Sequence, residues 1–295
     1  MIFVPYKVDV PMARWPIANF ILIGFTFLFS IAMFSPLNQW AESQQLNQIG
    51  LDTAYPAIVD YVLLQPHNFH ISQLVGNLFI HEGVLHLVGN MMFLFVFGNA
   101  VNAKLGHAKF IAIYLVVGIV ESTLWVLVGP GVPCLGASGA IMGIVGAFLL
   151  LYPLNDVSIA YWIFFMFMGV KEFSAMWVIA FYFAFDVWGL VSSGNSGVAY
   201  LAHVVGFLTG AAITSAFLKY NVVEMDHGEK SLLQHWGYMP HEETPLAPSS
   251  LLASTAPAKA RRVSHGYVPP GYETANTPRA PTRRPPRDEG PIDLL

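Results

Sequence analysis

The pentapeptide Gly-Ala-Ser-Gly-Ala at residues 136–140 places a serine between glycines at the start of an apolar run. If that run is a helix, Ser138 lies in its first turn, where backbone N–H groups lack intrahelical partners and the helix dipole favours negative charge. The glycines let another backbone approach closely. These features suit a nucleophile whose own N–H stabilises an oxyanion, although the same string also suits a small-residue packing site.

A serine hydroxyl becomes a strong nucleophile only when a base takes its proton, and histidine is the side chain best suited to this near neutral pH. His203 is followed by a G-x-x-x-G pair, Gly206 and Gly210, which allows close approach to a second helix. Gly139 and Gly143, next to the serine, offer the complementary surface. The spacing therefore predicts a Ser-His dyad between two closely packed helices.

Two further polar residues, His86 and Asn90, are four positions apart and so share one face of a helix, about 40° apart. Their side-chain N–H groups could stabilise the oxyanion of an acyl-transfer intermediate, together with the N–H of Ser138. The alternative is that each makes a hydrogen bond that only holds helices together.

The segment His81-Glu-Gly-Val-Leu-His86 resembles a zinc motif but has the wrong spacing. Two histidines five positions apart lie about 140° apart around a helix, whereas H-E-x-x-H puts both ligands on one face. We therefore predict no metal site and no cofactor, and expect His81 to order the entry to its helix.

The composition requires a membrane. Hydrophobic residues make up 55% of the chain and charged residues 11%, and the apolar runs are too long for a soluble domain to cover. The single cysteine, Cys134, excludes an internal disulfide, so helix packing must hold the fold.

Six apolar stretches are expected to be transmembrane helices, the fourth somewhat short: residues 18–34, 83–100, 110–128, 137–152, 175–191 and 198–218. Residues 157–173 are apolar but interrupted by charges, and we expect an interfacial segment there. We therefore predict an all-α membrane domain at 17–219, a short N-terminal segment at 1–16 and a tail at 220–295. From residue 241 onward the tail is rich in Pro, Ser, Thr and Arg, which predicts disorder.

The positive charges predict the orientation. Within and around the predicted spans, Lys and Arg occur only on one side: Lys7, Arg14, Lys104, Lys109, Lys171 and Lys219. By the positive-inside rule both termini are cytoplasmic, and we expect a bacterial cell (inner) membrane. Spans two, four and six then enter from the other side, where Asn90 lies about 10 Å and His203 about 8 Å along their spans. The polar groups can meet at similar depth, facing the non-cytoplasmic side.

Three motifs resemble those of the rhomboid intramembrane serine proteases. In chain order they are H-x-x-x-x-H-x-x-x-N at 81–90, G-A-S-G-A at 136–140 and A-H-x-x-G-x-x-x-G at 202–210. The resemblance covers roughly residues 17–219. It implies a six-helix bundle that hydrolyses peptide bonds in transmembrane protein substrates by a Ser-His dyad, without a third acid. Ser138 is then the nucleophile, His203 the base and acid, and His86 and Asn90 the oxyanion donors, while Asp186 is expected to be structural.

The sequence departs from the family pattern at three places. Ser72-Gln73 stands where the family often has Trp-Arg, Asn102 stands where it has an acidic residue, and Met142 replaces an aromatic that in some members stacks on the histidine. These changes bear on loop packing and substrate preference and leave the catalytic set intact.

Two other functions remain open. A catalytically inactive rhomboid-like scaffold would bind membrane proteins without cleaving them, and a transporter would explain Glu121, an acid in the middle of the third span. Neither nucleic acid nor a cofactor is an expected partner; the expected partners are transmembrane protein substrates and the lipid bilayer. The oligomeric state stays open.

Overall fold

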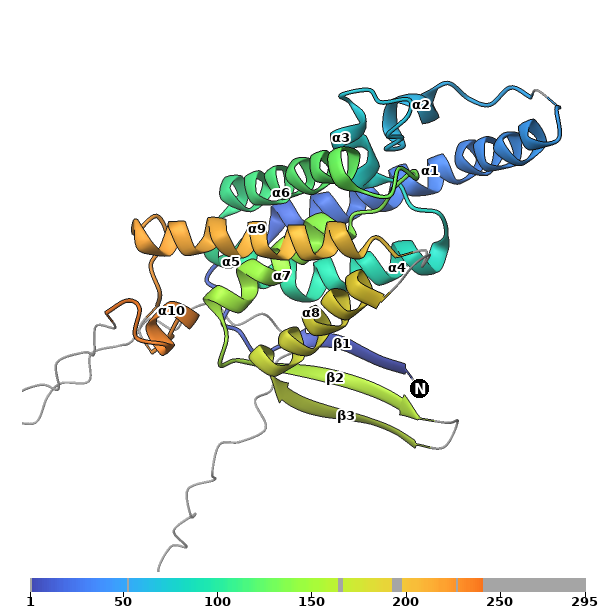
Figure 1. The fold of residues 1–295 in the computed structure, drawn as a ribbon. Coiled ribbons are helices and arrows are strands. Elements are labelled where there is room, and N and C mark those ends of the chain that lie inside the picture. The colour runs from blue at the N-terminus through green and yellow to red at the C-terminus, as the bar shows by residue number, and fades with distance from the viewer. Residues whose placement is uncertain (1, 52, 164–166, 193–197, 227, 241–295) are drawn as a thin grey trace, which may run out of the picture. The chain divides into compact units, whose positions relative to one another are not determined.

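Long apolar helices dominate a computed structural model of the chain, which describes residues 2–51, 53–163, 167–192, 198–226 and 228–240 (Figure 1). Five helical segments are long and apolar enough to cross a bilayer. They are α1 (Ile17–Gln48), the continuous segment Val84–Leu105, α6 (His107–Val128), α8 (Ala175–Ser192) and α9 (Tyr200–Lys219). The segment Val84–Leu105 consists of α4 (Val84–Phe93), the π-helix η2 (Leu94–Gly98) and α5 (Asn99–Leu105).

The fourth predicted span is α7 (Ser138–Leu151), which is apolar but has only 14 residues. Its side chains are almost all buried, because α7 lies in the middle of the bundle against α6 and α9 (Figure 1). The structure is mostly helical, and every span predicted for the multi-pass membrane domain is found as a helix.

Helix α1 is longer than predicted. We expected the first span to end at residue 34, before Ser35-Pro36, but α1 includes Pro36 and continues to Gln48. Its added turns pack against the first loop, where Leu37 joins a small apolar cluster with Leu63 and Ile80. That loop contains α2 (Ile58–Val62), α3 (Gln73–Gly76) and the 3-10 turn η1 (Asn77–Phe79). Burial against the loop outweighs the hydrogen bond that Pro36 cannot donate.

A three-stranded antiparallel sheet accompanies the helices and corrects the all-helical expectation. It consists of β1 (Ile2–Val8), β2 (Asp156–Ile163) and β3 (Phe167–Ser174), in the order β1-β2-β3. The segment that we predicted to be interfacial thus forms β2 and β3, and the predicted N-terminal segment supplies the third strand. Val8, Val157 and Ile159 join the main core, so the sheet is packed against the helices.

The chain after α9 also packs on the bundle, up to residue 240. Val223 and Leu232, the latter in α10 (Leu232–His235), join the main core. The side chain of Lys104, 4% exposed, lies 2.7 Å from Asp226 and 3.0 Å from Glu229. The ordered unit therefore extends beyond the predicted boundary at Lys219, while the predicted disordered tail, residues 241–295, lies outside the described residues.

Candidate functional site

The loop before Ser138 is held from two sides. Cys134 and Leu64 exchange two backbone hydrogen bonds, of 2.9 and 3.2 Å, and the N–H of Gly136 donates to the carbonyl of Asn77 at 3.0 Å. Gly136 has a φ of +118°, and a Cβ there would lie 2.9 Å from Cε1 of His86. Only glycine meets both demands easily, so the loop passes close under His86 and presents Ser138 as the first residue of α7.

Helices α7 and α9 are in direct backbone contact. A Cβ on Gly206 would overlap the carbonyl oxygen of Gly139, and one on Gly210 would overlap that of Gly143. The predicted close approach of these glycine pairs is confirmed. Because His203 lies three residues before Gly206 and Ser138 lies one residue before Gly139, this contact brings both residues to the same end of the paired helices.

His203 is oriented by a carboxylate on α8. Its Nδ1 donates to Oδ1 of Asp186 at 3.0 Å, and both side chains are largely buried. With its proton on Nδ1, the ring has an unprotonated Nε2, which is the form that a general base needs. The sequence predicts a structural role for Asp186, and its spacing to His203 does not indicate this bond.

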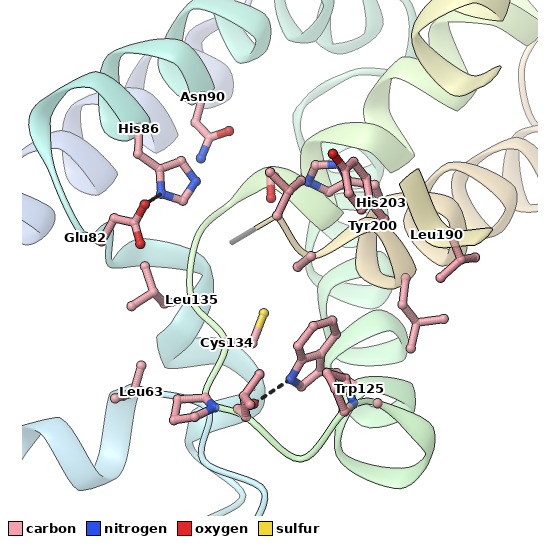
Figure 2. A pocket seen from close by; sticks show the side chains of 18 of the residues that line it. Leu63, Glu82, His86, Asn90, Trp125, Cys134, Leu135, Leu190, Tyr200 and His203 are labelled. Atoms are coloured by element: carbon pink, nitrogen blue, oxygen red, sulfur yellow. Dashed lines mark hydrogen bonds and ion pairs between the residues drawn. The ribbon is translucent and has the colours of Figure 1, made fainter. Parts of the chain in front are cut away.

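One cavity of about 1000 Å³ brings together all four predicted site residues, namely Ser138, His203, His86 and Asn90. Figure 2 shows His86 and Asn90, from α4, on one side of the cavity and His203 on the other. Most of the remaining lining is apolar, including Trp40, Leu63, Trp125, Val132 and Leu135. The cavity can therefore hold an extended, largely apolar peptide against a few polar groups.

His81 fixes the position of Asn90. Its Nε2 lies 2.8 Å from Nδ2 of Asn90, and its Nδ1 lies 2.8 Å from Oγ of Ser30, which in turn donates to the carbonyl of Phe79. Since the amide nitrogen can only donate, Nε2 accepts and Nδ1 donates. Burial, with a smaller contribution from neighbouring His86, lowers the pKa of His81 to about 3.

Both ring nitrogens of the neutral His81 side chain therefore have a hydrogen-bond partner, which leaves no lone pair for a metal ion. Asn90 lines the cavity while its amide nitrogen donates to His81. His81 thus orders the entry to α4, as the sequence predicted, but it does so by holding a predicted oxyanion donor.

The three departures from the family pattern are each accommodated. Gln73 is buried and bonds the first loop to itself, with Nε2 donating to the carbonyls of Asp60 at 2.6 Å and Asn68 at 2.9 Å. Asn102 accepts from the backbone N–H of Asn19 at 3.2 Å, which ties α5 to α1. Met142 is buried in the main core.

Comparison with protein families matches residues 68–220, about half of the chain, to the rhomboid domain. Among curated proteins, the putative rhomboid protease YdcA of Bacillus subtilis is 30% identical over 139 residues, covering 47% of this chain and 63% of the relative. Rhomboid protein 1, mitochondrial, of Saccharomyces cerevisiae is 36% identical over 104 residues, covering 32% of this chain and 29% of the relative.

The presenilin-associated rhomboid-like protein, mitochondrial, of Mus musculus is 29% identical over 143 residues, covering 47% of this chain and 36% of the relative. The matched part of this chain thus spans less than two thirds of the length of each of these relatives. The matched domain contains α4 to α9 and all four predicted site residues. From this match and the helical membrane fold, the chain belongs to the rhomboid family.

Proposed function

We propose that this protein is an intramembrane serine endopeptidase, which hydrolyses peptide bonds in or near the transmembrane segments of other membrane proteins. The observation that carries the proposal is the shared cavity: Ser138 and His203, on two helices in backbone contact, line it together with His86 and Asn90. Family membership supports the reaction class.

The reaction proceeds through an acyl-enzyme. Nε2 of His203 takes the proton of Ser138 as Oγ attacks the scissile carbonyl, and the same imidazole then gives that proton to the leaving amine. Water, activated by His203, hydrolyses the ester and restores the serine. Asp186 holds the ring with Nδ1 protonated throughout and so acts as a positioning residue.

The tetrahedral intermediate carries its negative charge on the former carbonyl oxygen. We assign three donors to this oxygen: the N–H of Ser138 at the start of α7, the second N–H of the Asn90 amide, and the His86 ring. Fixed donors of this kind act strongly because little water competes with them inside the membrane domain.

The site faces the non-cytoplasmic side of a bacterial cell membrane in our proposal. Lys104 and Lys109 both contact the segment after α9, so two of the basic residues lie together at the end of the bundle where α9 ends. The positive-inside rule assigns that end to the cytoplasm. A topology reporter fused at Gln65, in the first loop, checks this orientation and should report the non-cytoplasmic compartment.

The test of the proposed function is cleavage of a transmembrane substrate by purified protein in detergent. Ser138→Ala and His203→Ala should each reduce cleavage to background, and the double variant should be little worse, because members of one catalytic unit are not additive. Asn90→Ala should lower the rate by up to about 10²–10³-fold, less if the other donors compensate. A fluorophosphonate reagent should label the wild type and not Ser138→Ala.

Two results would remove the proposal. Equal cleavage by a folded Ser138→Ala protein would exclude a serine mechanism. A wild type that neither cleaves nor reacts with the fluorophosphonate, but binds membrane proteins, would establish the inactive scaffold instead.

A further inference from the structure

A carboxyl group lies directly behind the first turn of α7. Glu121, on α6, is 2% exposed. A Cβ on Gly139 would lie 2.7 Å from its Cδ and 3.0 Å from its Oε1, so the carboxyl fills the space that this glycine leaves. The described residues that line the cavity include Ser138 but not Glu121. The carboxyl therefore contacts the backbone that carries the nucleophile without facing the substrate.

A chain of hydrogen bonds connects this carboxyl to the loop on the other side of Ser138. Oγ of Ser122 donates to Oε1 of Glu121 at 3.2 Å, and Nδ2 of Asn77 donates to Oγ of Ser122 at 3.0 Å. The backbone carbonyl of Asn77 accepts from Gly136 at 3.0 Å. This series of hydrogen bonds thus begins at the carboxyl packed against Gly139 and ends at Gly136, and the nucleophile lies between these two glycines.

A carboxyl inside a membrane span is costly to bury, and such residues usually have a function. None of the ion pairs among the described residues includes Glu121. A leucine of similar size would fill the same space without that cost. The property that distinguishes Glu121 is its acceptor oxygen, which orients Ser122 and through it Asn77.

We propose that Glu121 is a positioning residue for the nucleophile. With Ser122 and Asn77 it fixes the loop–helix junction at residues 136–139, so that Ser138 stays within reach of His203. The inference rests on the proposed function, because it assigns Glu121 a part in the reaction of that same site.

The first test compares three variants of Glu121 and Ser122 with a control on the same helix. Glu121→Gln keeps the size and the acceptor oxygen, Glu121→Ala removes both, and Ser122→Ala interrupts the chain. Thr123→Val is the matched control, because the Thr123 hydroxyl is exposed and bonds only within α6, to the carbonyl of Ile119. The measurements are kcat, KM and the rate of fluorophosphonate labelling.

We expect Glu121→Ala and Ser122→Ala to lower kcat and the labelling rate by about 10- to 100-fold at unchanged KM, since small misplacements of a reacting group cost this much. The double variant should be no worse than Glu121→Ala alone. Glu121→Gln and Thr123→Val should stay within about threefold of wild type, well below the loss that misplacement causes. Wild-type kcat in Glu121→Ala, or a loss in Glu121→Gln as large as in Glu121→Ala, would overturn the proposal.

Cys134 provides a second readout that does not need proteolysis. It is the sole cysteine of the chain, lies in the loop before Ser138 and lines the cavity. Burial, with a contribution from Glu121, raises the pKa of its thiol, so alkylation of the folded wild type should be slow. We expect a maleimide to react several-fold faster with Glu121→Ala than with wild type, because a released loop exposes the thiol.

Glu121→Gln should keep the slow rate. Both substitutions remove the same carboxylate. An equal increase in the alkylation rate of both variants would therefore show that the lost carboxylate, and not a displaced loop, exposes the thiol, and it would contradict the inference. This readout works in a protein without protease activity. A failure of the positioning role is thereby distinguished from a failure of the proposed function.

Discussion

The side chain that most sharpens the candidate site is Asp186. It accepts from Nδ1 of His203 and so selects the tautomer in which Nε2 can act as a base. The dyad that the sequence predicted therefore has an acid partner in this chain. Because the bond joins the middle of α8 to the first turn of α9, it also fixes how these two helices meet.

Asp186→Asn should lower kcat at least about tenfold with little change in KM, because an amide can donate to Nδ1 and hold the wrong tautomer. Steady-state cleavage of a transmembrane substrate measures both constants. Asp60→Asn, in the first loop, controls for loss of an acid that bonds only loop residues. An unchanged kcat in Asp186→Asn would show that packing alone orients His203.

Residue types and spacing were enough to name four of the residues that line the cavity, because serine, histidine and asparagine near helix starts carry a recognisable chemistry. The partners of these residues could not be predicted. His81 holds Asn90, and Asn77 holds Gly136, through bonds that exist only once the first loop is folded over the bundle. No pattern along the chain records such contacts.

At the level of elements, the contact between α7 and α9 carries the alignment of the site. Gly206→Ala places a methyl group against the carbonyl oxygen of Gly139, so the helices must separate. We expect a loss of about 1–3 kcal/mol in unfolding free energy and a marked fall in cleavage, measured by thermal unfolding in detergent and by the substrate assay.

Gly89→Ala is the matched control for Gly206→Ala. A Cβ on Gly89, in α4, would meet no atom within 4 Å, so this substitution should be neutral or slightly stabilising. If both variants behave alike, close packing of α7 on α9 does not determine the geometry of the site.

Apolar runs located all six spans, but two other elements could not be read from local sequence. Pro36 is normally a sign that a helix ends, yet α1 continues because Leu37 and Trp40 pack against the first loop. The composition of residues 157–173 suits an interfacial segment and a pair of strands equally well. Of the two strands found there, β2 pairs with residues 2–8, far away along the chain, and β3 pairs with β2.

For the molecule as a whole, Lys104 fastens the chain after α9 to the bundle. Its buried ammonium group bonds both Asp226 and Glu229, and the carboxylate of Glu229 is largely buried as well. Residues 220–240 belong to the tail predicted from the sequence, which begins after the last apolar span. Their packing through Val223, Leu232 and the contacts of Lys104 is not evident from their composition.

Lys104→Ala should lower the unfolding free energy by about 1–3 kcal/mol, since it leaves two carboxylates without their partner. Lys109→Ala is the control, because among the described residues Lys109 makes no ion pair and donates to the backbone carbonyl of Val222. Truncation after residue 240 should leave stability and cleavage nearly intact, whereas truncation after residue 219 should reproduce or exceed the loss in Lys104→Ala. Equal stability of the two truncated proteins would contradict this assignment.

The pairing of β1 with β2 has a consequence for how the protein is made. About 150 residues separate the two strands, from Val8 to its partner Val157. At typical rates of translation, the first strand leaves the ribosome roughly 8–30 s before its partner exists. During that interval the four predicted spans between the two strands can enter the membrane while β1 lacks its partner, so β1 reaches its final place only after helices that follow it in the chain.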